Sequence, residues 1–205
     1  MLFRSGGTFS GGNDNLIEVG QCQNCSMTIN GGTFYSPSVG GANILAFYSY
    51  NTGRLTVNNG NFINERAGNC VYAFTWQNVG SGGQIDITGG TFTTGGVAIK
   101  NNRDTIVNIS GGNFKSTGNI TINNMSTGTI NITGGNFEST TDNTIYNGAD
   151  GTININGEQA TFDENDNYVS GVYVHSSANA TLISNLGTMS VVGGLYDSNK
   201  TVFHS

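Results

Sequence analysis

The sequence predicts an all-β fold, a parallel β-solenoid of about eight coils with three short strands in each coil and almost no helix. A phrase of two glycines or a close variant, then Thr or Asn, then an aromatic residue, returns along the chain at intervals of 22 to 34 residues. Its aromatic members are Phe9, Phe34, Phe62, Phe92, Phe114, Phe137, Phe162 and Tyr196. Repeats of this length stack on one another, so that each unit buries its apolar side against its neighbours.

The first strand of each repeat is an alternating apolar and polar run just before the glycines. Ile85–Thr88, Val107–Ser110 and Ile130–Thr133 show this pattern. Alternation is typical of a strand with one buried face. We therefore expect these strands to pair with their equivalents one coil above and one coil below.

The glycine phrase forms a corner and begins a second strand. Glycine accepts a positive φ and a close approach of the backbone without a steric penalty. We expect the glycines to bend the chain and the aromatic residue to anchor the stack inside the solenoid. The residues with this predicted role are Gly31, Gly32, Phe34, Gly89, Gly90, Phe92, Gly111, Gly112, Phe114, Gly134, Gly135 and Phe137.

A further apolar run forms the third strand of each repeat. The runs assigned to it are Leu16–Val19, Ile44–Phe47, Val97–Lys100, Ile120–Asn123 and Val172–Val174. A β-propeller and a β-sandwich are the alternatives. Propeller blades need about 40 residues each, and a sandwich does not explain the recurring phrase. We expect a single solenoid domain over residues 1–205, without terminal caps.

These repeats resemble right-handed parallel β-helix proteins of the pectate-lyase-like type, and the Gly-Gly-Thr-Phe repeat regions of bacterial surface adhesins and phage tail or fibre proteins. The resemblance covers essentially the whole chain. It implies a right-handed coil and an extracellular location, on a cell surface, in a filament or in a virion. It also leaves two functional classes open, because one solenoid serves both structural proteins and carbohydrate-active enzymes.

The composition argues against two kinds of partner. Only 7 Lys and Arg are present and the net charge is −6, so we expect no nucleic-acid binding. No apolar run approaches the roughly 18 residues of a membrane span, so we expect no membrane insertion.

Catalytic residues are not predicted. Glycan-cleaving enzymes need paired or clustered carboxylates, but the outward position of the alternating strand is acidic only at Asp86. The row reads Thr28, Thr56, Asp86, Asn108, Asn131, Asn154 and Ser190. Most other acids occupy predicted corners, where Asp usually binds its own backbone. We therefore expect a non-enzymatic protein, with a polysaccharide lyase or hydrolase as the alternative.

Calcium is the only cofactor that the sequence suggests. Asp163, Asn165 and Asn167 have the spacing of alternate oxygen ligands in a calcium loop. However, Tyr168 stands where that loop has glycine, and Val174 stands where it has the closing Glu. A solvated acidic turn is the alternative.

Two cysteines are close in sequence and one is distant. The spacing of Cys22 and Cys25 fits a local disulfide, or two ligands of a metal that needs four. We favour the disulfide, which leaves Cys70 without a partner.

An aromatic set near the third strands is the candidate for glycan binding. Tyr48 and Tyr50 follow one third strand, and Tyr72 and Trp76 occupy the matching place one coil later. Rings at such positions could form an exposed ladder that offers apolar area and polar groups to a sugar. Packing into the core is the alternative for the members that point inward.

The predicted absence of caps suggests partners at the ends of the rod. Unpaired strand edges invite association. We expect self-association or partner chains there, and surface glycans as a further class of partner. The sequence thus favours a structural or adhesive rod that displays loops for binding; the alternative is a pectate-lyase-like enzyme or glycan-binding protein.

Overall fold

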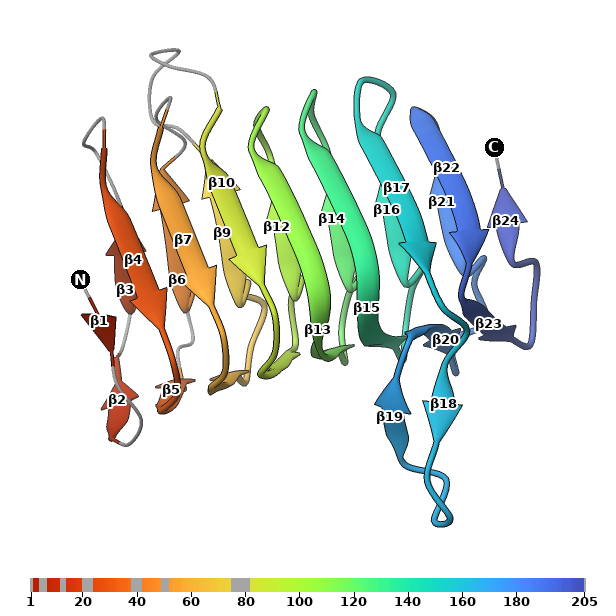
Figure 1. Ribbon diagram of the computed structural model, residues 1–205, viewed down its shortest axis with the longest axis horizontal. Helices are drawn as coiled ribbons and strands as arrows, with labels where there is room; N and C mark the ends of the chain where they lie inside the picture. The colour runs from red at the N-terminus through yellow and green to blue at the C-terminus, as the bar shows by residue number, and fades with distance from the viewer. Residues whose placement is uncertain are drawn as a thin grey trace.

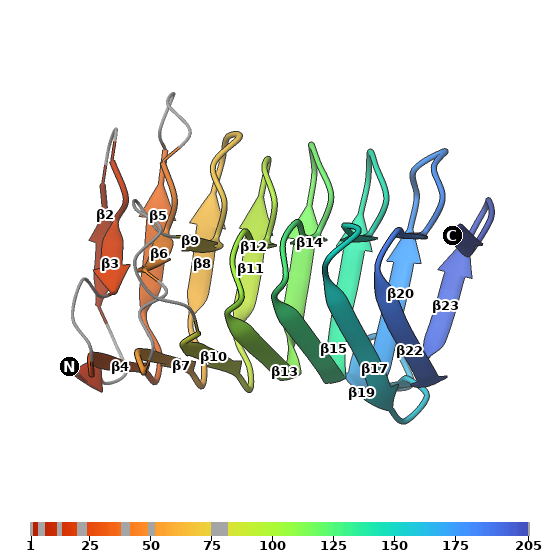
Figure 2. The ribbon, with the colours of Figure 1, turned by 90° about the horizontal axis from the view of Figure 1, so that it is seen from above.

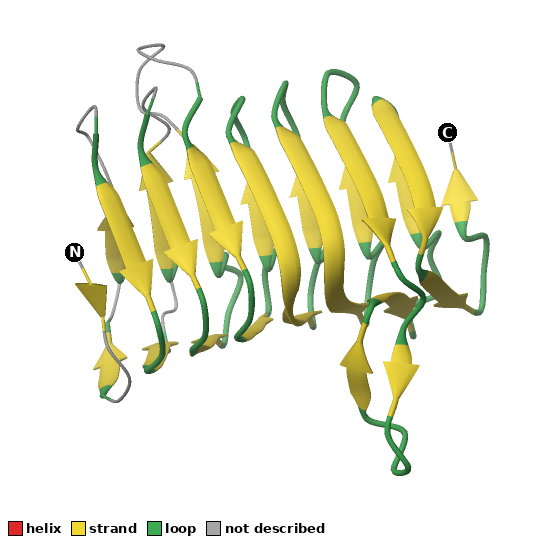
Figure 3. Cartoon of the chain, in the orientation of Figure 1, coloured by secondary structure: helices red, strands yellow, loops and turns green. Residues whose placement is uncertain are grey.

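The computed structural model shows a parallel β-solenoid of about seven turns (Figure 1). It describes residues 2–3, 7–11, 14–19, 24–37, 42–48, 52–74 and 82–204. Every described segment is strand or loop (Figure 3), and no described residue belongs to a helix that could cross a membrane. The solenoid predicted from the sequence is confirmed, with about seven turns against the expected eight.

Three parallel ladders form the walls. The first ladder contains β1 (Leu2–Phe3), β4 (Ser26–Ile29), β7 (Arg54–Val57), β10 (Gln84–Ile87), β13 (Ile106–Ser116), β15 (Thr129–Ser139), β17 (Thr152–Gly157) and β22 (Thr188–Gly193). Its register matches the alternating runs residue by residue, as where Ile85 pairs with both Leu55 and Val107. The alternation of buried and half-buried residues along these strands follows from this pairing.

The second ladder begins after the glycine corner. It contains β2 (Thr8–Ser10), β5 (Thr33–Ser36), β8 (Asn61–Asn64), β11 (Thr91–Thr94), the later halves of β13 and β15, β20 (Val172–Ser176) and β23 (Leu195–Ser198). In β13 and β15 the strand runs through the corner without a break, with shifts of register at Ser110.

The third ladder closes each coil. It contains β3 (Ile17–Val19), β6 (Leu45–Tyr48), β9 (Val71–Phe74), β12 (Ile99–Asn101), β14 (Ile122–Asn124), β16 (Ile145–Asn147), β21 (Ile183–Asn185) and β24 (Phe203–His204). Figure 2 shows the coils following one another along the long axis of the molecule.

The glycine corners behave as predicted. The second glycine of each pair has a positive φ, for example 109° at Gly112 and 124° at Gly135. The first glycine allows a close approach between coils, because a Cβ at Gly134 would lie 2.4 Å from the carbonyl oxygen of Ser110. The two glycines therefore serve two different purposes.

The aromatic residues after the corners form one stack inside the solenoid. Six rings lie face to face with centroids 4.6 to 5.1 Å apart, a spacing set by the strand separation. They are Phe9, Phe34, Phe62, Phe92, Phe114 and Phe137. Isoleucine, leucine and valine from all three ladders fill the rest of the core.

Two assignments near the C-terminal end were wrong. Phe162 is not a member of the stack; it lies on a hairpin and is 39% exposed. Its expected place belongs to Val174, which pairs with Phe137 on one side and Tyr196 on the other. Val172–Val174 is accordingly part of the second ladder, and the third strand of that coil is β21.

Candidate functional site

An antiparallel hairpin leaves the solenoid between β17 and β20. It consists of β18 (Thr161–Phe162) and β19 (Tyr168–Ser170). It projects from the side of the rod that carries the second ladder (Figure 1). Among the described elements, only these two strands lie outside the three ladders.

The turn of this hairpin is held by its own side chains. The Asp163 carboxylate accepts hydrogen bonds from the backbone N–H groups of Asn165 and Asn167, at 2.8 and 2.9 Å. Asp166 has a φ of 61°, a conformation that Asp and Asn adopt more readily than most residues. The local sequence thus fixes the backbone of the turn.

Tyr168 fastens the hairpin to the solenoid. Its hydroxyl donates to the Gly171 carbonyl at 2.7 Å and accepts from the Gly135 N–H at 3.0 Å. Phe162 lies edge-on to the ring of Tyr173, with centroids 5.2 Å apart. The hairpin is therefore packed against the outer face of the second ladder.

An open groove of about 420 Å³ lies between the hairpin and this face. We call it the hairpin groove. Its lining residues are Asn113, Asn136, Phe162, Asp166, Asn167, Tyr168, Tyr173 and His175.

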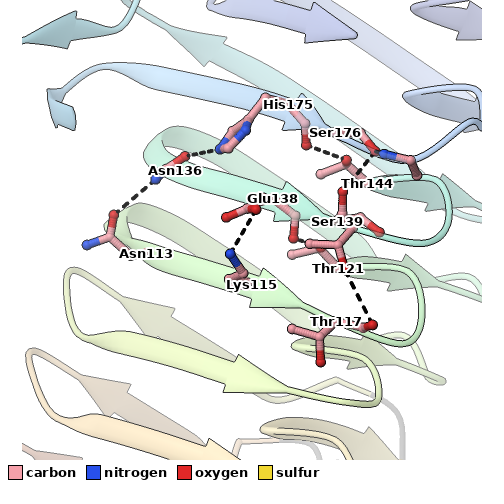
Figure 4. A network of polar contacts seen from close by, with 12 residues as sticks. Asn113, Lys115, Thr117, Thr121, Asn136, Glu138, Ser139, Thr144, His175 and Ser176 are labelled. Carbon is pink, nitrogen blue, oxygen red and sulfur yellow. Dashed lines mark hydrogen bonds and ion pairs between the residues drawn. The ribbon is translucent and has the colours of Figure 1, made fainter. Parts of the chain in front are cut away.

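Three lining residues, which we call the floor of the hairpin groove, form a polar network across three coils (Figure 4). Asn136 donates from Nδ2 to Asn113 Oδ1 at 3.3 Å, and its Oδ1 lies 2.9 Å from His175 Nε2. The ring of His175 also stacks on Tyr173, with centroids 4.2 Å apart. These contacts hold the side chains of the floor in place.

An ion pair runs beside the floor. Lys115 and Glu138 occupy matching positions of β13 and β15, and their charged atoms are 2.9 Å apart. The matching positions of the next two strands of the second ladder, β20 and β23, are His175 and Asp197. The cation of Lys115 is thus neutralised by a neighbour one coil away.

Burial lowers the pKa of His175, although Glu138 and Asp197 act in the opposite direction. The imidazole is therefore mainly neutral at pH 7. With Asn136 Oδ1 as the acceptor, it donates from Nε2. Burial also raises the pKa of Tyr173, as do Asp197 and Glu138, so this phenol stays protonated.

Several polar groups of the groove have no hydrogen-bond partner in the described part of the chain. They are the exposed carboxylate of Asp166, the exposed Nδ2 amide of Asn113, Oδ1 of Asn167 and Nδ1 of His175. The groove thus combines a charged acceptor, an amide donor and the partly exposed ring of Phe162. None of its lining residues is Lys or Arg.

The aromatic residues predicted to bind glycans lie elsewhere. Tyr48 is only 4% exposed and donates to Glu18 at 3.2 Å. Tyr72 is half-buried, accepts a hydrogen bond from Asn102 and lies under the ammonium of Lys100. Tyr48 is thus buried and not part of an exposed ladder. Tyr50 and Trp76 lie outside the described residues, so glycan binding by the other members of the set stays a prediction.

The residues predicted to bind calcium form the hairpin turn. Asn167 donates to both carboxylate oxygens of Asp163, at 3.2 and 3.0 Å. The hydrogen bonds from Asn167, followed by those from the backbone of the turn, lower the pKa of Asp163. Within the described ranges, no three His, Cys, Asp or Glu residues gather as metal ligands would. The calcium site stays a prediction.

The cysteines differ in state. Cys25 is disulfide-bonded, while its predicted partner Cys22 lies outside the described residues. Cys70 is free and fully buried, and burial raises the pKa of its thiol. It packs as part of the core.

The hairpin groove was not predicted from the sequence. Its floor comes from three coils, so its residues are far apart in the chain. One signal was available: the Asp163–Asn167 run, rich in turn residues, separates two short segments with β-forming residues, which is typical of a hairpin.

Comparison with known proteins gave no match: no family model, no curated protein and no solved structure matches this chain.

Proposed function

We propose that this protein is a non-enzymatic solenoid rod that carries the β18–β19 hairpin as a display element for binding. The observation that supports this proposal is the position of the hairpin. It stands outside the ladders, and it adds the hairpin groove to an otherwise regular wall. Such a rod fits a surface appendage, a filament or a virion fibre.

The repeats themselves support a structural role. Their most regular residues are the phenylalanine stack and the glycine corners, which lie in the core or between coils. A residue that is buried in this way supports the rod and cannot contact a ligand. Binding then belongs to surface elements outside the repeated pattern, such as the β18–β19 hairpin.

The acids near the groove also favour binding over catalysis. Glu138 pairs with Lys115, Asp163 holds the turn, and Asp197 accepts from the Tyr173 hydroxyl at 3.3 Å. A hydrolase or lyase of the pectate-lyase-like type needs paired or clustered carboxylates that are free to act on the substrate, whereas Asp166 is the single unpartnered acid among the described lining residues. That enzyme is the alternative proposal.

An extracellular location is part of the proposal. Disulfides persist in oxidising environments outside the cytosol, and Cys25 is disulfide-bonded. A right-handed coil is a further part of the proposal, and it rests on the resemblance of the repeats to right-handed parallel β-helix proteins.

We also propose association at the end of the rod formed by β22, β23 and β24. Each of these strands pairs with a neighbouring coil on one side only. Val192 and Phe203 are 60% and 46% exposed there. Further strands from a partner chain or a second copy would cover both the open edge and these side chains.

Removal of the hairpin tests the display role. Gly171 lies against Gln159 and Ala160, because its Cβ would be 2.5 Å from the Gln159 oxygen. Residues 161–170 can therefore be replaced by Gly-Ser without stretching the chain. We expect an unchanged circular dichroism spectrum and a melting temperature within a few degrees of the intact protein, since Gly135 N–H still donates to the Gly171 carbonyl at 2.8 Å.

The matched control removes a coil instead. Deletion of residues 106–128, one repeat of the solenoid, should alter stability much more, because it disturbs the stack and all three ladders. Collapse of the hairpin-free protein would contradict the proposal, since the hairpin would then be structural. Release of reducing ends or unsaturated products from polysaccharides by the intact protein would contradict the non-enzymatic role.

A further inference from the structure

We propose that the hairpin groove binds a neutral sugar, with Asp166 and Asn113 as its principal hydrogen-bonding groups. This inference rests on the proposed display function and names the ligand class of its groove. It concerns a site distinct from the aromatic residues around Tyr48 and Tyr72.

The unpartnered groups of the groove suit a pair of sugar hydroxyls. A hydroxyl donates one hydrogen bond and accepts others. The Asp166 carboxylate can only accept, while the free Nδ2 protons of Asn113 can only donate. Together they match the donor and the acceptor role of sugar hydroxyls within one groove, and the charged acceptor makes the stronger hydrogen bond.

The apolar part of the groove suits the C–H face of a sugar ring. Phe162 is 39% exposed, although its ring is held by its edge-on contact with Tyr173. A fixed ring with one open side offers apolar area at little cost in side-chain entropy. Sugars combine such a C–H face with hydroxyls at the rim, which matches the mixed lining.

The charge of the groove excludes acidic sugars as the preferred ligand. Asp166 is the only charged residue of the lining when His175 is neutral. Asp163 lies in the same turn, and Asp197 contacts Tyr173. Lys115, which lies beside the floor of the groove, is paired with Glu138. A uronic acid would bring a second negative charge into this environment without a counter-charge.

The test is a titration followed by NMR chemical shifts. The probes are maltotriose, cellotriose and chitotriose as neutral sugars, and trigalacturonic acid as the acidic one. We expect at least one neutral trisaccharide to shift the amide signals of Asp166, Asn113 and Tyr173. We expect trigalacturonic acid to bind at least tenfold more weakly.

Matched variants locate the site. Asp166→Asn keeps a residue that accepts a positive φ but removes the carboxylate charge, and it should weaken binding about tenfold, equivalent to roughly 1.4 kcal/mol. Glu164→Gln removes the same charge from the same turn, outside the groove lining, and should leave binding unchanged. Asn113→Ala should weaken binding, whereas Asn61→Ala, two coils away in the same row, should not.

Three results would overturn the inference: no binding of any neutral probe, tighter binding of trigalacturonic acid, or equal binding by the Asp166→Asn variant and the intact protein. Thermal unfolding of each variant confirms that it is folded. None of these results bears on the display role, which the hairpin-free protein and the assay for bond cleavage test separately.

Discussion

At the scale of the residue, the phenylalanine stack explains why one aromatic residue returns at the same point of six successive coils. Every ring lies on the ring of the coil before it, at the spacing of paired strands. Interior rings such as Phe92 contact an aromatic face on both sides and are fully buried. Phe9 lies at the end of the stack and is 37% exposed.

This difference predicts unequal effects of the same substitution. Phe92→Ala should lower the free energy of unfolding by about 3–5 kcal/mol, because it opens a cavity within the stack. Phe9→Ala should lower it by less than half as much, since part of its ring is already in water. Urea unfolding followed by circular dichroism measures both values. Equal losses would mean that the stack does not contribute through burial.

At the scale of the element, an outward ladder joins four coils along the first wall. Asn154 donates to Asn131, Asn131 to Asn108 and Asn108 to Asp86, at 2.8 to 2.9 Å. Arg54 binds the other oxygen of Asp86 at 2.8 Å. Burial raises the pKa of Asp86, but the hydrogen bonds from Asn108, Gln84 and Arg54 outweigh it, so that the pKa is lowered overall.

A lowered pKa predicts how the stability depends on pH. A carboxyl group with a lower pKa in the folded state stabilises the protein above its unfolded pKa of about 3.9. That contribution is lost as the pH falls through the folded pKa. Asp86→Asn should therefore reduce the free energy of unfolding at pH 7 by up to about 1 kcal/mol, since Arg54 is largely exposed.

The control for this substitution is Asp150→Asn. The Asp150 side chain is exposed and makes no hydrogen bond to any described residue, so its replacement should change the free energy of unfolding little at pH 7 or at pH 2. The cost of Asp86→Asn should shrink as the pH falls from 7 towards 2, as measured by thermal or urea unfolding. An equal loss of free energy of unfolding at pH 7 and at pH 2 would show that the charge of Asp86 does not stabilise the ladder.

The strands of this fold could be predicted from the sequence because most repeats contain the same local pattern, an alternating apolar and polar run followed by two glycines. Alternation at Ile85–Ile87 and glycines at Gly111 and Gly112 act locally, so their consequences can be read without knowing what lies nearby. The error at Phe162 has a physical cause. Its phrase lacks the glycine pair, and without that bend the chain continues outward into the hairpin.

The hairpin groove could not be predicted in the same way. Asn113, Asn136 and His175 come together only because parallel pairing places them on adjacent coils. The proximity of these three residues depends on the register in which β20 pairs with β15. The β18–β19 hairpin is an insertion before β20, so the spacing of the repeats in the sequence does not give this register.

At the scale of the whole molecule, a solenoid distributes its stability along its length. Each coil contacts only its two neighbours, so stability is close to a sum of interfaces between adjacent coils. β14 and β16 are paired on both sides, whereas β24 is paired only with β21. Opening should therefore begin at the open edge.

Hydrogen exchange should record this order. We expect the amides of β14 and β16 to exchange most slowly, and those of β22, β23 and β24 to exchange faster by a factor that grows with distance from the centre. Mass spectrometry of proteolytic fragments measures the rates. Identical protection in all coils would contradict this order and would indicate one cooperative unit. A partner chain that covers the open edge should slow the exchange of the β24 amides first.

The direction of the backbone hydrogen bonds has a mechanical consequence. They run from coil to coil, along the long axis of the rod, because strands pair in that direction (Figure 2). A tensile force between the two ends of the rod would load these bonds lengthwise. The coils would then peel away one at a time, and each would release a length of chain of roughly two dozen residues. Such a rod absorbs a pull by lengthening in steps, while its remaining coils stay intact.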